Sequence, residues 1–173
     1  MIVIGEFNQW ESLMSIGRPT VNIVDPAKND EVIEKDVANT VPDQIKILGT
    51  VGSSNVPVSL QWRGGTAFPG VPTAEWHIVG QKGVIRFTSS TWALNVISAD
   101  RKIEVLDSAT GEVEVLEVEP DEWDSLPVTA RNIAKVYEAY RKGEWWPDWE
   151  WAIKRHEQLE DLWRSFDEGK VVK

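Results

Sequence analysis

The sequence has 173 residues, with no cysteine and two histidines. The lack of cysteine excludes a disulfide framework, catalysis by a thiolate and zinc sites built on cysteine. Apolar residues do not run long enough to form a membrane span. The sequence also shows no targeting leader in which a basic segment and an apolar segment precede a cleavage site of small residues. We therefore expect a soluble intracellular protein.

Basic residues are also scarce. The chain has 18 Lys and Arg against 28 Asp and Glu, which gives a formal net charge of -10. Proteins that bind nucleic acid derive most of their affinity from contacts of Lys and Arg with phosphates, and anionic membrane surfaces attract the same residues. We therefore expect no nucleic-acid partner and no membrane partner.

Short alternating segments separated by turn residues predict a meander of antiparallel strands over about residues 2–118. In the first strand, Trp10, Ser12, Met14 and Ile16 could share one face. Residues 31–42 have a poor pattern and are predicted to form an exposed connection. The acidic alternation over residues 112–119 is typical of a solvated strand face. The later predicted strands are residues 20–24, 44–51, 56–63, 75–79, 84–88, 93–98, 102–106 and 113–118.

After Pro120 the apolar period becomes helical, which predicts helices over about residues 127–142 and 148–168. Gly143 is placed to cap the first helix in the left-handed conformation, and Gly169 to end the second. The expected apolar stripe of the second helix is Trp149, Ala152, Ile153, His156, Leu159, Trp163 and Phe166. The predicted fold is therefore α+β, a single domain over residues 1–173. It has a large, mostly antiparallel sheet with one face covered by helices, two of them C-terminal.

Several motifs together resemble one known family. The central ones are Trp62-Arg63-Gly64-Gly65, Phe68-Pro69-Gly70 and Trp76-His77-Ile78-Val79-Gly80-Gln81-Lys82-Gly83, and others lie at residues 4–7, 18–19, 41–51 and 149–170. Their order resembles the C-terminal domain of the Gfo/Idh/MocA oxidoreductases. Within that family, they resemble the branch that includes the fungal galactose-regulon repressor. The resemblance runs over nearly the whole chain.

The resemblance implies more than this chain contains. Full-length members carry an N-terminal Rossmann domain that binds NAD(P), and their catalytic lysine and histidine precede the region matched here. Gly64, Gly65 and Gly70 do not have the dinucleotide-binding spacing. We therefore expect no cofactor bound by this chain alone and no catalytic residue within it. The implied partners are a Rossmann domain in the full-length protein, a second copy bound through the sheet, and a sugar or protein ligand.

Six residues are candidates for lining a substrate or partner cleft: Arg18, Arg63, Gly64, Gly65, Trp76 and His77. The guanidinium groups of Arg18 and Arg63 each present a planar fork of donors, which suits a sugar hydroxyl or a carboxylate. Ion pairs with the many acidic residues are an equally good interpretation of these two arginines. Trp76 and His77 alternate on a strand, so they point to opposite faces. Glu75 shares the face of His77, but two ligands do not make a metal site. The pair Trp145 and Trp146 could form an exposed apolar patch.

Two functions remain open from the sequence. The first is a substrate-side and oligomerisation domain of an NAD(P)-dependent sugar or polyol oxidoreductase, incomplete and inactive alone. The alternative is a regulatory protein-binding domain similar to the galactose-regulon repressor, without turnover. A third possibility is a decayed fragment with no activity. The sequence does not decide whether the chain belongs to an enzyme. It predicts a cytoplasmic location, or cytoplasm or nucleus for a eukaryotic regulator.

Overall fold

The computed structural model describes residues 4–91 and 100–168. The chain forms two compact units: the first is Met1–Gly65 with Trp149–Lys173, and the second is Thr66–Asp148. The strand predicted over residues 93–98 and the helix end predicted at Gly169 lie outside the described residues. The prediction of one domain over the whole chain stays a prediction.

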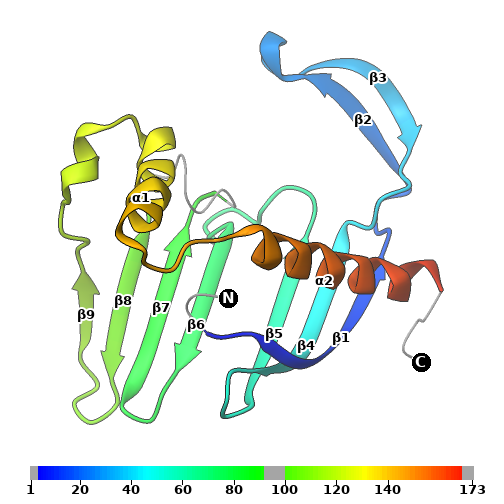
Figure 1. Cartoon of the computed structure of the whole chain (residues 1–173). Helices are drawn as coiled ribbons and strands as arrows, with labels where there is room; N and C mark the ends of the chain where they lie inside the picture. The colour runs from blue at the N-terminus through cyan, green and yellow to red at the C-terminus, as the bar shows by residue number, and fades with distance from the viewer. Residues whose placement is uncertain (1–3, 92–99, 169–173) are drawn as a thin grey trace. The chain divides into compact units, whose positions relative to one another are not determined.

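The first unit contains a three-stranded antiparallel sheet in the order β1-β4-β5 (Figure 1), formed by β1 (Phe7–Ser15), β4 (Gln44–Val51) and β5 (Val56–Arg63). The last two strands have the bounds predicted from the sequence. Ser12 lies opposite Ile47, which lies opposite Leu60. Successive residues point to opposite faces, so one face of this sheet carries most of its apolar side chains.

A second strand pair in this unit corrects one prediction. β2 (Thr20–Asp25) and β3 (Glu31–Ala38) form an antiparallel hairpin, joined through the short 3-10 helix η1 (Pro26–Lys28). Residues 31–42 were expected to be an exposed connection, which is wrong for residues 31–38. Pairing with β2 satisfies the backbone of β3 although most of its side chains are exposed.

The helix α2 (Trp149–Asp167) packs against β1 in the same unit. Arg155, Gln158, Leu159 and Leu162 line a cavity together with Phe7, Trp10 and Ile47 of the sheet. Leu159 belongs to the predicted stripe of α2, but most of the large apolar residues of that stripe are exposed. Trp149 is 81% exposed, and Ile153, Leu159 and Trp163 are exposed as well. The helix has apolar residues on two sides, and periodicity alone did not show which side meets the sheet.

The second unit contains a four-stranded antiparallel sheet in sequence order. Its strands are β6 (Ala74–Val79), β7 (Gly83–Ser89), β8 (Lys102–Asp107) and β9 (Val113–Leu116). The 3-10 helix η2 (Glu122–Ser125) follows, and α1 (Val128–Lys142) packs against it. Gly143 caps α1 as predicted, with a φ of 69° and its N–H donated to the carbonyls of Ala139 and Tyr140.

The predicted α+β class is confirmed, since every strand pair within residues 4–91 and 100–168 is antiparallel and the two long helices are C-terminal to the strands. In the described part of the chain, no helix is long and apolar enough to cross a membrane.

Candidate functional site

Arg18 and Asp43 form an ion pair at one end of the first sheet. The Arg18 Nε–H donates to Asp43 Oδ2 at 2.6 Å, and the Gly17 N–H donates to Asp43 Oδ1 at 2.6 Å. Asp43 immediately precedes β4 and its side chain is 8% exposed. Its backbone also ties the end of the sheet together, since the Asp43 N–H donates to the Ser15 carbonyl and the Gly64 N–H donates to the Asp43 carbonyl. The carboxylate thus holds Arg18 at a fixed place where three segments meet.

Gly64 and Gly65 lie beside this arginine. A Cβ atom on Gly64 would come 2.5 Å from Arg18 Nη2 and 3.0 Å from the Cβ of Asp43, so the guanidinium occupies the space of the missing side chain. Gly65 has a φ of 107°, in the region that favours glycine. The structure therefore brings together three of the sequence-predicted residues, Arg18, Gly64 and Gly65. It gives the glycines a role in packing against the arginine.

The guanidinium of this cluster carries hydrogen-bond donors that Asp43 does not use. The hydrogen bond from Arg18, and then that from the Gly17 N–H, lower the pKa of Asp43, so the carboxylate is charged at neutral pH. The Arg18 side chain is 48% exposed. Asp43 engages the Nε–H, and Nη2 lies beside Gly64. A planar guanidinium held in this way suits a ligand carboxylate or sugar hydroxyl.

Arg63, next to Gly64 in the chain, has a different position. It lies opposite Gln44 at the end of β5, while its neighbour Trp62 lies opposite Ile45. Alternation along β5 places Trp62 on the face of Ile45 and Ile47, and Arg63 on the other face. Ile47 lines a cavity with residues of α2. Arg63 is therefore exposed on the sheet face away from α2.

Trp76 and His77 belong to the second unit. Trp76 lies opposite Phe87 and is half-buried, while His77 lies opposite Arg86 on the other face and is exposed. His77 Nε2 is 3.2 Å from Glu75 Oε1, a contact between neighbours on one strand face. That these residues line a cleft stays a prediction.

Glu104 carries a buried charge that was not predicted from the sequence. Arg86 donates to its Oε2 through both Nε and Nη2, at 2.9 and 2.6 Å, and Lys102 donates to its Oε1 at 2.7 Å. The hydrogen bond from Lys102, and then those from Arg86, lower the pKa of Glu104. In the sequence, Lys102 precedes Glu104 by two residues and Arg86 lies in an earlier strand. Such charges are common on exposed sheets, so they did not single out Glu104.

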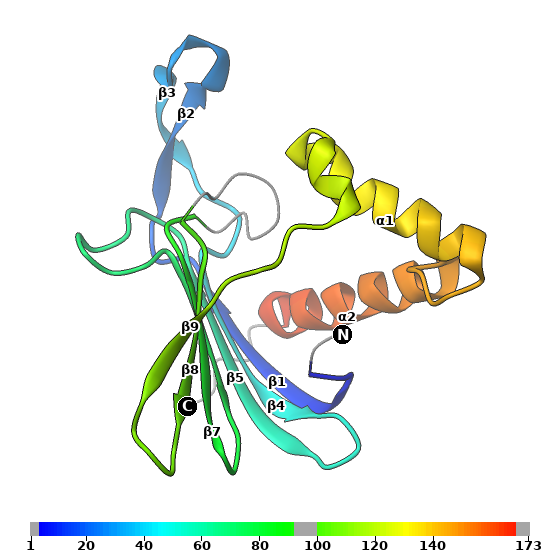
Figure 2. The ribbon, with the colours of Figure 1, turned by 90° about the vertical axis from the view of Figure 1, so that its left-hand side faces the viewer.

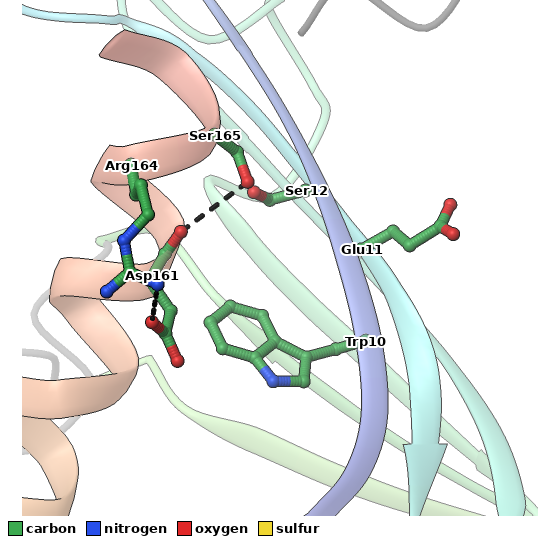
Figure 3. Close-up of a pocket in the computed structure, with 6 residues that line it drawn as sticks. All are labelled: Trp10, Glu11, Ser12, Asp161, Arg164 and Ser165. Atoms are coloured by element: carbon green, nitrogen blue, oxygen red, sulfur yellow. Dashed lines mark hydrogen bonds and ion pairs between the residues drawn. The ribbon is translucent and has the colours of Figure 1, made fainter. Parts of the chain in front are cut away.

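Two pockets lie between β1 and α2. The first, of about 210 Å³, is polar and is lined by Trp10, Glu11, Ser12, Asp161, Arg164 and Ser165. Within it Asp161 pairs with Arg164 at 3.0 Å (Figure 3). The second, of about 250 Å³, is mostly apolar and includes Phe7, Trp10, Ile47 and Leu162. Arg155 also lines this pocket and is paired with Glu6. Its Cζ atom lies over the ring of Trp151, 5.2 Å from the ring centroid. The two arginines at these pockets, Arg164 and Arg155, already form ion pairs within the protein.

The described residues contain no group of three or more His, Asp or Glu side chains that could hold a metal ion. His77 contacts Glu75, but no serine or threonine nucleophile is hydrogen-bonded to either of them among the described residues. The described residues offer an anchored arginine and exposed strand faces.

Comparison with known proteins decides the family. Residues 1–89, just over half of the chain, match the family of the C-terminal domain of Gal80p. The chain belongs to this family. The branch expected from the sequence motifs, that of the fungal galactose-regulon repressor, is confirmed. A search among functionally characterised proteins found no significant match.

Solved structures of Gal80p share the fold. The super-repressor mutant Gal80(S2) from Saccharomyces cerevisiae is 17% identical, with a TM-score of 0.74 over 96% of this chain and 44% of that chain. The transcriptional regulator Gal80p from Kluyveromyces lactis is 20% identical, with a TM-score of 0.69 over 95% of this chain and 40% of that chain. The chain thus spans less than half the length of these structures. At such identities the likeness shows the fold alone.

Proposed function

We propose that this chain is the partner-binding C-terminal domain of a Gal80p-like regulator. The observation that carries the proposal is the match of residues 1–89 to the Gal80p C-terminal family. The similar solved structures are of a transcriptional regulator and of super-repressor mutants. In this role the strand faces bind another protein, and the chain alone binds no dinucleotide. Its place in the cell is the cytoplasm or the nucleus.

One feature favours the substrate-side domain of an NAD(P)-dependent sugar or polyol oxidoreductase as a second candidate. Arg18 is held by Asp43, its side chain is half-exposed, and its Nη2 lies beside Gly64. Such a guanidinium would orient a sugar hydroxyl or carboxylate against a nicotinamide that a Rossmann domain supplies. In a regulator, the same arginine would bind a carboxylate of the partner protein.

A turnover assay separates the two functions. The chain, and the longest natural protein that contains it, are incubated with NAD+ or NADP+ and a panel of aldoses and polyols, and formation of the reduced cofactor is followed by absorbance. The regulator role predicts no turnover with any substrate. Turnover that is lost in Arg18→Ala would establish the second candidate instead.

We also propose that two copies associate through the sheet face of the first unit that lies away from α2. Leu48 of β4 is on this face and is 62% exposed, which is a large apolar group to leave in water. A two-fold arrangement would bury it against its own copy. Light scattering should give the mass of two chains for the native protein and of one chain for Leu48→Glu. A native mass of one chain at high concentration would contradict this.

A further inference from the structure

The strand β9 lies at the edge of the four-stranded sheet. It pairs with β8 on one side, and no other strand of the described residues pairs with its outer side. Figure 1 shows it at the end of the sheet, and in Figure 2 the same edge faces the viewer. An edge strand offers unpaired backbone donors and acceptors to another extended chain.

The register shows which backbone groups are offered. The Asp107 N–H donates to the Glu112 carbonyl, so the pair Asp107 and Glu112 is hydrogen-bonded. Hydrogen-bonded and non-hydrogen-bonded pairs alternate in an antiparallel ladder. Val113, opposite Leu106, and Val115, opposite Glu104, therefore form non-hydrogen-bonded pairs. Their N–H and C=O groups point outward, away from β8.

The side chains at this edge are also uncovered. Val113 is 59% exposed, Val115 49%, Leu116 43% and Val118 79%. Val113 and Val115 share one face with Leu106 and Glu104, their partners on β8. A strand added outside β9 would place its own alternate side chains beside these valines, which favours aliphatic residues at those positions.

The charge of the edge is of one sign. Residues 111–130 contain no Lys or Arg, whereas Glu112, Glu114, Glu117 and Glu119 flank the valines. Within the described residues, no ion pair involves these four glutamates, while Asp121 and Asp124 pair with Lys135 and Arg131. Two copies of β9 side by side would bring glutamates close together, which disfavours self-pairing. A strand with basic residues would be attracted instead.

We propose that the outer edge of β9 binds an extended peptide segment in which Lys or Arg alternates with aliphatic residues. The segment adds a fifth strand to the sheet through the outward backbone groups of Val113 and Val115. Its aliphatic side chains lie beside the valines, and its basic side chains lie on the other face, near Glu112 and Glu114. The surface and the partner chemistry are specific to β9, so this proposal does not depend on the role of Arg18 or on self-association of the sheet.

The test uses three labelled peptides of equal length in fluorescence anisotropy titrations with the chain. The first alternates lysine and valine, the second alternates glutamate and valine, and the third has the composition of the first with its lysines and valines in two blocks. We expect the first peptide to bind at least tenfold more tightly than either of the others. If the third peptide, with its lysines and valines in two blocks, bound as tightly as the first, charge attraction alone would explain the binding. That result would overturn strand addition.

Two variants separate the backbone from the charge contribution. Val115→Pro removes an outward N–H and leaves the hydrogen bonds to β8 in place, so it should weaken binding of the lysine–valine peptide at least tenfold. Val115→Ala keeps the N–H and should change binding less than threefold. Unchanged binding by a folded Val115→Pro protein would overturn the proposal.

Glu114→Lys should invert the preference between the lysine–valine and glutamate–valine peptides, or at least abolish it. This variant decides the question if circular dichroism shows that Val115→Pro does not fold. A Glu114→Lys protein that keeps the full tenfold preference for the lysine–valine peptide would contradict the assigned site.

Discussion

Val51 anchors the first sheet, and its truncation should be costly. It is the last residue of β4 and only 3% exposed. Val51→Ala removes two methyl groups, worth about 0.8 kcal/mol each in lost burial. The cavity left behind adds a further cost, so we expect the free energy of unfolding to fall by about 2 to 3 kcal/mol. For a chain of this length that corresponds to a fall in melting temperature of roughly 5 to 10 °C.

The matched control is the residue directly across the ladder. Val56 of β5 lies opposite Val51, and it is 51% exposed. Val56→Ala deletes the same two methyl groups, half of whose surface already faces water, so its cost should be about 1 kcal/mol or less. Urea unfolding followed by circular dichroism measures both variants. Equal losses, or a larger loss for Val56→Ala, would refute the assignment of Val51 to the core of this sheet.

Two further predictions concern the arginine cluster. Gly64→Ala should lower the urea midpoint because its Cβ, 2.5 Å from Arg18 Nη2, displaces the guanidinium from Asp43. The control is Gly80→Ala, which should be nearly neutral because the added Cβ meets its nearest atom at 3.5 Å. Equal midpoints for the two variants would show that Arg18 does not pack against Gly64. The pKa of Asp43 is lower in the folded protein than its unfolded value of about 3.9. The charged carboxylate therefore contributes fully to stability above the unfolded pKa, and this contribution is lost as the pH falls through the folded pKa. The difference in stability between wild type and Asp43→Asn should therefore keep its full size from neutral pH down to about pH 4 and shrink as the pH falls further, through the folded pKa. A difference that is independent of pH would contradict the ion pair.

The fold was largely predictable because its elements have strong local signals. β4 and β5 alternate regularly between turn residues, and α1 ends at a glycine in the left-handed conformation. β3 was missed because its sequence, from Glu31 to Ala38, is charged and mostly exposed, and its extended form is stabilised by pairing with β2. Pairing across a hairpin is not a local property of the sequence.

The candidate site was predictable only in part. Arg18 and Gly64 were chosen from motifs, but their contact depends on a register that joins the ends of β1, β4 and β5. Asp43, the residue that holds the arginine, lies in the motif at residues 41–51 but was not among the six predicted site residues. An aspartate that follows a proline and precedes a strand has many possible partners, and only the fold selects one.

The direct test of the account is a calorimetric titration of the chain with NAD+, NADH, NADP+ and NADPH. Our proposal gives this domain a partner-binding role without a dinucleotide site of its own, and its glycines at 64 and 65 pack against Arg18. We predict no binding heat with any of the four at millimolar concentration. Saturable binding in the micromolar range would contradict this account.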